Sequence, residues 1–325
     1  MRYVFVIVLF LIFQITNGQI FQLAKGDIFK MKDSDTIPKW EQTNRVGLDI
    51  NEVTFINWSA GGSNSISALL AFTSSLNYTY GLLKWKNKAL VNYGVNKQQD
   101  QKLRKTTDEL ELISTMGFQK DSLSNWYFSA RFNFKTQFTN GYNYPNRDNP
   151  ISRFMAPGYL FVGGGVEYGK NIEKFSTYFS PLTFKSTFVL AEDLSNAGAF
   201  GVEPAVMDEE GNIIKQGERV RTEVGILLTN EFESEVFENI GVKHRASLYT
   251  DYLNSFGNVD VDWEVMFNFK VNQYVKASLG SHVRYDDDVK TVVTINEGTE
   301  QEEQLMEGAK IQWKQFLGIG VVVDF

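Results

Sequence analysis

Several residue types are missing or scarce in this chain. Its 325 residues include no cysteine, two histidines and six prolines. Without cysteine, the chain has neither disulfides nor thiolate metal sites, and we interpret His244 and His282 as structural. No proline-rich or Ser/Gly-rich linker divides the sequence, so one continuous domain is the simplest organisation. Positive charge is also in deficit, with 32 lysines and arginines against 39 acidic residues, which argues against a nucleic-acid partner.

Long apolar runs are absent as well. The run from Val4 to Phe13 is about ten residues long, too short to cross a bilayer as a helix. It follows Met1-Arg2 and precedes a segment ending at Gly18-Gln19, the layout of a secretory signal. We therefore expect residues 1–19 to be cleaved. No later segment is apolar for long enough to form a transmembrane helix.

Alternation of apolar and polar residues is what the sequence has instead. From Val259 to Asn272 every odd position is apolar, and every even position except Met266 is polar or charged. The segment from Asn125 to Phe138 follows the same pattern. A period of two predicts strands, and because about ten tilted residues cross the hydrocarbon core, strands of this length are typical of membrane barrels.

The same template predicts about twelve strands. They cover residues 45–58, 65–80, 83–95, 108–119, 124–139, 158–170, 174–190, 218–231, 241–253, 258–272, 274–286 and 309–325. We expect an all-β, antiparallel transmembrane β-barrel over residues 45–325, with short periplasmic turns, long extracellular loops and both termini in the periplasm. The longest loops are residues 140–157, 191–217 and 287–308, and residues 20–44 form a periplasmic N-terminal segment or a plug.

The closing strand, from Ile311 to Phe325, indicates the location. Its odd positions are apolar except Gln315, and its even positions carry Lys314, glycines and Asp324. A strand that is apolar on one face and ends the chain on phenylalanine resembles the terminal strand of a bacterial outer-membrane barrel, so we expect the outer membrane of a Gram-negative bacterium.

Charged residues on the polar faces are the candidate lumen residues. Pairing the tenth and eleventh strands about Gln273 sets Asp262 opposite Arg284 and Glu264 opposite His282. We also expect Lys84, Lys86 and Lys88 to lie beside Glu109 and Glu111. These charges either brace the barrel or select a diffusing solute. The candidates are Lys84, Lys86, Glu109, Glu111, Arg131, Lys135, Asp262, Glu264, His282 and Arg284.

Two further segments are candidate sites. Asp286, Asp287 and Asp288 offer carboxylates to Ca²⁺, but they lack the spacing and glycine of a calcium loop, so a solvated acidic turn is preferred. Between the first two strands, Gly61-Gly62 permits a tight turn, Trp58 suits an interfacial girdle, and Asn57 and Asn64 can close the turn. That segment is either a structural turn or a surface that binds a glycan or a protein.

Several short motifs are distinctive when taken together. They are Asn57-Trp58 with Gly61-Gly62, Ser180 to Lys185, Gly198 to Val202, Val259 to Trp263, Tyr285 to Asp288, and Gln312 to Lys314 with Gly318 to Gly320. As a set they resemble a Bacteroidetes family of outer-membrane barrel proteins catalogued as a domain of unknown function. The resemblance implies an outer-membrane barrel over nearly the whole mature chain and supplies no catalytic residue.

The expected function is a small-solute channel or the barrel subunit of an envelope assembly, surrounded by outer-membrane lipid, with no cofactor and no enzyme activity. One alternative is a secreted soluble β-sandwich or lipocalin-like binding protein, in which the apolar faces point inward. Another is a lipid-modifying enzyme of the outer membrane that uses His244 with a serine such as Ser247. Opposite parity places those two side chains on opposite faces of their strand, which disfavours the enzyme.

Overall fold

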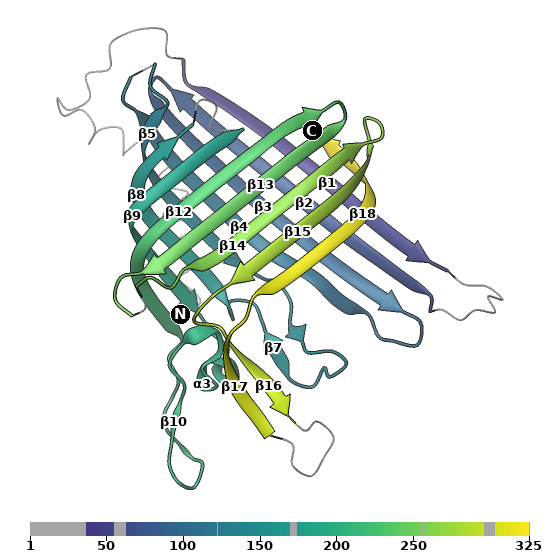
Figure 1. Cartoon of the computed structure of the whole chain (residues 1–325), viewed down its shortest axis with the longest axis vertical. Coiled ribbons are helices and arrows are strands. Elements are labelled where there is room, and N and C mark those ends of the chain that lie inside the picture. The colour runs from purple at the N-terminus through teal and green to yellow at the C-terminus, as the bar shows by residue number, and fades with distance from the viewer. Residues whose placement is uncertain are drawn as a thin grey trace. The chain divides into compact units, whose positions relative to one another are not determined.

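Residues 39–325 of the computed structural model form one unit, a closed barrel of twelve antiparallel strands (Figure 1). The structure describes residues 37–54, 63–121, 123–169, 174–254, 256–295 and 303–324. Consecutive barrel strands are neighbours, and the last strand closes the barrel against the first. Within these ranges, no helix is both long and apolar enough to span a bilayer.

The barrel wall accounts for most of the described chain. Its strands are β1 (Lys39–Val53), β2 (Ser65–Tyr80), β3 (Leu83–Gln98), β4 (Arg104–Gln119), β5 (Trp126–Thr136), β8 (Gly158–Tyr168), β9 (Phe175–Phe188), β12 (Val220–Phe237), β13 (Ile240–Asp251), β14 (Asp260–Lys270), β15 (Val275–Tyr285) and β18 (Gln312–Asp324). The connections add β6 (Gly141–Tyr142), β7 (Pro150–Ser152), the short helices α3 (Glu192–Asn196) and η1 (Ala199–Gly201), β10 (Val206–Met207), β11 (Ile213–Lys215), β16 (Lys290–Ile295) and β17 (Glu303–Ala309).

All twelve predicted strands are present, in the predicted order. The predicted pairing of β14 with β15 is also confirmed, with Asp262 opposite Arg284 and Glu264 opposite His282. The predicted boundaries differ most at β12, which ends at Phe237 rather than at residue 231, and at β1, which begins at Lys39 rather than at residue 45. Its outward residues Gln42 and Asn44 are polar, so the alternation fades there, although the ladder with β2 continues to Lys39. Residues 1–36, with the predicted signal, lie outside the described residues.

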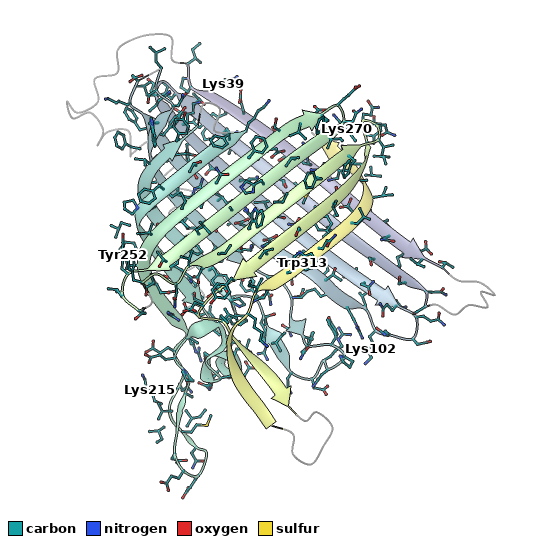
Figure 2. The ribbon with its side chains drawn as sticks, viewed as in Figure 1. Lys39, Lys102, Lys215, Tyr252, Lys270 and Trp313 are labelled. Atoms are coloured by element: carbon teal, nitrogen blue, oxygen red, sulfur yellow. The ribbon has the colours of Figure 1, made fainter. Side chains whose placement is uncertain are left out.

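The connections alternate in length around the barrel. Residues 81–82, 120–125, 169–174, 238–239 and 271–274 join the strands at one end, which we name the turn end. The longer connections, including 137–157, 189–219 and 286–311, lie at the opposite loop end, where α3, β7, β10, β16 and β17 project beyond the wall (Figure 1). In Figure 2, Lys39 and Lys270 mark the turn end, and Lys102 and Lys215 mark the loop end.

The apolar side chains of the strands point outward. Phe128 is 65 % exposed and Trp313 is 68 % exposed, whereas Glu167 inside the barrel is fully buried. Near the turn end, the ring of Trp40 lies 4.7 Å from that of Tyr78, as in an interfacial aromatic girdle. An apolar exterior around a charged interior is the arrangement of a transmembrane barrel. The soluble alternative is therefore wrong, because it requires the apolar faces to point inward.

A charge placed on the outer face should test this orientation directly. Phe267 on β14 is 38 % exposed, and replacing it with arginine should destabilise the barrel by about 2–4 kcal/mol, because lipid solvates that charge poorly. The same change at its lumen-facing neighbour Met266 provides the control. Urea unfolding in phospholipid vesicles measures both variants. Equal losses of stability would contradict an outward Phe267.

Candidate functional site in the barrel lumen

Ion pairs cross the barrel lumen between strands that are not neighbours. Arg245 of β13 contacts Glu111 of β4 at 2.6 Å, and Lys135 of β5 lies 3.7 Å from Asp262 of β14. Arg131 of β5 also donates a hydrogen bond to Thr229 of β12 at 2.6 Å. These contacts tie one wall of the barrel to the other, so the lumen is bridged rather than open.

The other predicted lumen residues also point inward. Lys86 pairs with the fully buried Glu167 at 2.8 Å, and the ammonium of Lys84 lies 5.7 Å from the centre of the Tyr127 ring. The remaining pairs are Lys135 with Glu109 at 2.8 Å, Arg245 with Glu264 at 3.8 Å, His282 with Asp262 at 2.7 Å and Arg284 with Asp262 at 3.6 Å. Selection of a solute by these charges stays a prediction.

The expected belt between β3 and β4 is wrong in its partners. The ladder sets Lys86 opposite Thr115 and Lys88 opposite Ile113, so the lysines lie closer to the turn end than Glu109 and Glu111 do. The acidic residues turn instead to Lys135 and Arg245. The alternation of odd and even positions correctly placed these lysines and glutamates on the lumen face. Which residues lie opposite one another depends on the register between β3 and β4, and that register depends on the connection at residues 99–103.

A small cavity with both charged and apolar side chains in its wall remains between the cross-lumen pairs. Its volume is about 110 Å³, and its lining includes Arg131, Lys135, Asp262 and Arg245 together with aromatic side chains such as Phe161. A space of this size, with charged groups in its wall, has room for a few water molecules.

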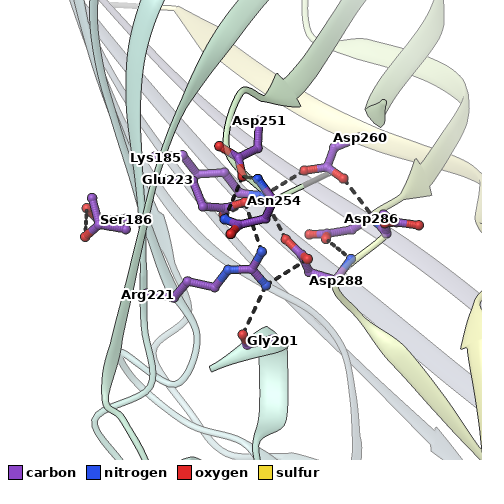
Figure 3. Close-up of polar contacts among 12 residues, drawn as sticks. Lys185, Ser186, Gly201, Arg221, Glu223, Asp251, Asn254, Asp260, Asp286 and Asp288 are labelled. Atoms are coloured by element: carbon purple, nitrogen blue, oxygen red, sulfur yellow. Dashed lines mark hydrogen bonds and ion pairs between the residues drawn. The ribbon is translucent and has the colours of Figure 1, made fainter. Parts of the chain in front are cut away.

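A second cluster of charges lies where the lumen meets the loop end, and we name it the mouth cluster. Its members are Lys185, Arg221, Glu223, Asp260 and Asp288 (Figure 3). The ammonium of Lys185 lies 2.7 Å from Asp260 and 3.4 Å from Glu223. Arg221 contacts Asp288 at 2.7 Å and Glu223 at 3.3 Å. Lys185 is 3 % exposed and Glu223 is 2 % exposed, so each buried charge depends on its partners.

The aspartate triplet forms part of this region, and it is a turn, as predicted, but its side chains are half-buried rather than fully solvated. Asp288 binds Arg221, whereas Asp287 accepts a hydrogen bond from Asn258 at 2.7 Å. Burial raises the pKa of the Asp286 carboxyl, and the charges of Asp260 and Asp288 add to that rise. Among the described side chains, no group of three or more histidines, aspartates or glutamates is placed to hold a metal ion. The carboxylates of Asp287 and Asp288 therefore have different protein partners, and one of those partners is the cation Arg221.

The long connections pack together over the loop end, and we name residues 189–219 the cap. Ala156, Val189 and Val202 form a small buried core, against which Leu194 and Phe200 pack. The carbonyl of Gly201 in η1 accepts a hydrogen bond from Arg221 at 3.1 Å. Arg221 therefore connects the cap to the mouth cluster. The sequence predicted only a long loop here, and it could not show this core because the core combines residues from two separate connections.

His244 lies on the outer face, in a chain of polar side chains. The indole of Trp263 donates to Nδ1 of His244 at 3.0 Å, and Nε2 lies 3.0 Å from the side-chain oxygen of Asn230. Ser247 faces the lumen cavity instead. The pairing that a Ser–His enzyme needs is therefore missing at this position, as opposite parity predicted. The wider expectation that the chain is not an enzyme stays a prediction.

Of the predicted surface turn, only Asn64 is described, and Asn57, Trp58, Gly61 and Gly62 lie outside the described residues. The Asn64 carbonyl accepts a hydrogen bond from the backbone of Gln99 at 2.7 Å. This contact links the start of β2 to the connection after β3. A role for the segment in binding a glycan or a protein stays a prediction.

Sequence reasoning overlooked several of the residues that hold the lumen together. Glu223, Arg245 and Glu167 lie at lumen-facing positions of predicted strands, so parity could have identified them. Lys185 follows an irregularity in β9 that shifts the parity of the strand between Ser180 and Thr183, so parity alone would have placed it on the wrong face. Their partners could not have been identified, because Arg245 and Glu111 are 134 residues apart in sequence. Contacts across a lumen depend on closure of the whole sheet.

Comparison with known proteins gives a partial family match and remote likenesses in fold. The model of a protein family of unknown function, DUF3078, matches residues 50–142, which is less of the chain than the sequence motifs implied. No curated protein matches the chain.

Solved structures with some likeness are bacterial outer-membrane barrels. The COG4313 outer membrane channel from Pseudomonas putida F1 is 11 % identical, with 87 % of this chain and 95 % of that chain covered and a TM-score of 0.39. The NanC porin is 8 % identical, with 86 % of this chain and 98 % of that chain covered and a TM-score of 0.33. The translocator domain of the autotransporter NalP from Neisseria meningitidis is 10 % identical, with 89 % of this chain and 89 % of that chain covered and a TM-score of 0.28.

Proposed function

We propose that this protein is an outer-membrane β-barrel that serves as the membrane-embedded subunit of an envelope assembly and does not conduct ions in its resting state. A closed barrel with an apolar exterior is suited to the outer membrane of a Gram-negative bacterium. The bridged lumen carries the second part of the proposal. Arg245 reaches Glu111 at 2.6 Å from the opposite wall, which leaves little space for a permeating solute.

The loop end supports a role in assembly. The cap has its own small core around Val189 and Val202, and it is tied to the wall through Arg221. Beyond that core, the hairpin of β10 and β11 projects from the barrel (Figure 1) and exposes Ile214 and Met207. Exposed apolar side chains on an ordered projection are typical of surfaces that contact another protein.

Electrical recording from the purified protein in planar bilayers tests this proposal. We expect no steady conductance at voltages of either sign, because the cross-lumen pairs stay closed. Purification in a mild detergent should in parallel retain an envelope protein bound to the barrel. Steady ohmic conductance of the native protein, or isolation of the barrel only as a lone monomer, would count against the assembly role.

A small-solute channel is the second candidate, and the cavity favours it. The cavity is lined by charges of both signs, including Lys135 and Asp262, as in the constrictions of selective pores. In that case the native protein should conduct, and reversing the charge at Arg131, Lys135 or Asp262 should change its ion selectivity.

A further inference from the structure

The cap is held on one side of the loop-end opening by an apolar core. Val189 and Val202 pack there with Ala156, which belongs to the connection between β5 and β8. On the side of β12 and β15 the cap is held by polar contacts instead, and these converge on Arg221. The two sides of the cap are therefore attached by interactions of different kinds.

Within the cap, η1 reaches from β12 to the connection that follows β15. The carbonyl of Gly201 accepts a hydrogen bond from Arg221 at 3.1 Å, and the guanidinium of Arg221 lies 2.7 Å from the carboxylate of Asp288. Gly201 also approaches Asp288 directly, because a Cβ added to the glycine would lie 2.9 Å from the Cβ of Asp288 (Figure 3). Since β13 and β14 lie between β12 and β15 in the barrel, these contacts span part of the loop-end opening.

The contacts of η1 lie on the loop side of the lumen cavity. Lys185 and Asp260 of the mouth cluster line that cavity, and the ammonium of Lys185 lies 4.0 Å from Asp288. Asp288 in turn binds Arg221 and borders Gly201. The cap, the mouth cluster and the cavity therefore follow one another along the lumen. A molecule that enters from the loop end on this side meets the contact of η1 before it reaches the cavity.

The backbone of η1 is shaped for this close approach. Gly198, Phe200 and Gly201 have φ values of 69°, 57° and 81°, and a bulky residue such as Phe200 rarely adopts this left-handed conformation. Such strain persists where the surrounding structure holds the residue in place, and Phe200 packs against the core of the cap. A Cβ at position 201 would also lie 2.9 Å from a guanidinium nitrogen of Arg221, so the contact requires glycine.

The polar side of the cap is the side that can release. The side chains of Arg221 and Asp288 are 22 % and 19 % exposed, so water and salt ions reach this pair and weaken it. Salt does not screen the contacts of the apolar core, where Val189 is fully buried. A cap that is attached through an apolar core on one side and an ion pair on the other can open on the ionic side while its core stays packed.

From these contacts we propose that the cap is a lid over the loop end of the lumen, hinged at its apolar core and latched where Arg221 holds Gly201 and Asp288. The closed latch shuts the cavity off from the solution at the loop end. Its release exposes the cavity, while the cross-lumen pairs still bridge the barrel. The lid is a second barrier in the same lumen, so this inference rests on the proposed function: it requires a barrel inserted in the outer membrane with its loop end outside.

Cysteine labelling tests the lid, and the absence of native cysteine makes single-cysteine variants specific. Ser247→Cys places a thiol in the cavity wall, and a charged, membrane-impermeant maleimide is added to intact cells. Labelling should be slow in the otherwise native protein and severalfold faster when Arg221→Gln is added. Arg219→Gln is the matched control, because Arg219 binds Glu192 within the cap at 3.1 Å, and it should leave the labelling rate unchanged.

A thiol outside the lid separates failure of the lid from failure of its setting. Glu209→Cys lies in the exposed turn between β10 and β11 and should react rapidly in every background. Equal labelling of Ser247→Cys with and without Arg221→Gln, beside rapid labelling of Glu209→Cys, would overturn the lid and leave the proposed function standing. Protection of Glu209→Cys in intact cells would overturn both the lid and the exposure of the loop end on which it rests.

Gly201→Ala tests the contact of η1 without removing a charge. Its added Cβ meets Arg221 and Asp288, so it should accelerate the labelling of Ser247→Cys as Arg221→Gln does. Gly211→Ala is the matched control, because Gly211 also has a positive φ, of 84°, but nothing lies within 4 Å of an added Cβ. Heat-modifiable migration on gels identifies folded barrels. A folded Gly201→Ala protein in which Ser247→Cys reacts at the native rate would overturn the proposal.

Discussion

Replacing Lys185 with methionine should destabilise the barrel by about 3–5 kcal/mol, because removing one partner of a buried ion pair leaves the other charges uncompensated. The ammonium of Lys185 lies 2.7 Å from Asp260, 3.4 Å from Glu223 and 4.0 Å from Asp288. Methionine preserves most of the side-chain volume and removes the charge. Urea unfolding in phospholipid vesicles, followed by the loss of heat-modifiable migration on gels, measures the change.

Lys215→Met provides the matched control, because Lys215 is 62 % exposed and lies 3.8 Å from both Glu203 and Glu218. An exposed pair of this kind contributes little to stability, so this variant should unfold at the same urea concentration as the native protein. If the two variants unfold together, the mouth cluster does not depend on the Lys185 ammonium.

Removing Arg245 and Lys135 together should turn the barrel into a conducting pore. The double variant Arg245→Ala with Lys135→Ala deletes the cations that reach Glu111 and Asp262 across the lumen. Steady conductance should rise at least about tenfold above the native background, with selectivity for cations, since the remaining carboxylates lose their positive partners. Recording in planar bilayers with a salt gradient measures the conductance and the reversal potential.

The control for this variant removes the same charges from outside the lumen. The double variant Arg219→Ala with Lys215→Ala breaks the exposed contact of Arg219 with Glu192 at 3.1 Å and the weak pairs of Lys215 with Glu203 and Glu218. It should not raise the conductance above the native background. A double lumen variant that migrates as a folded barrel and still does not conduct would show that the bridging pairs do not close the lumen.

The barrel could be predicted from the sequence because its main signal is local. Alternation from Val259 to Asn272 requires no knowledge of distant residues, and a period of two assigns each side chain to one of two faces. The same rule placed Asp262 and Arg284 opposite one another across a tight turn. It failed at Lys39 to Asn44, because polar residues on the outer face of β1 hide the alternation while its ladder with β2 continues.

The composition and periodicity of the chain by themselves determined that it forms a large antiparallel barrel with an apolar exterior, a charged interior and no cysteine chemistry. Tertiary structure decided how those charges meet, because the partner of Arg245 or Lys185 depends on the register of several ladders and on closure of the sheet. It also decided that the closing ladder ends at Ile50. Local periodicity places a side chain on a face, whereas contacts across a lumen and the length of a closing seam depend on strands far apart in sequence.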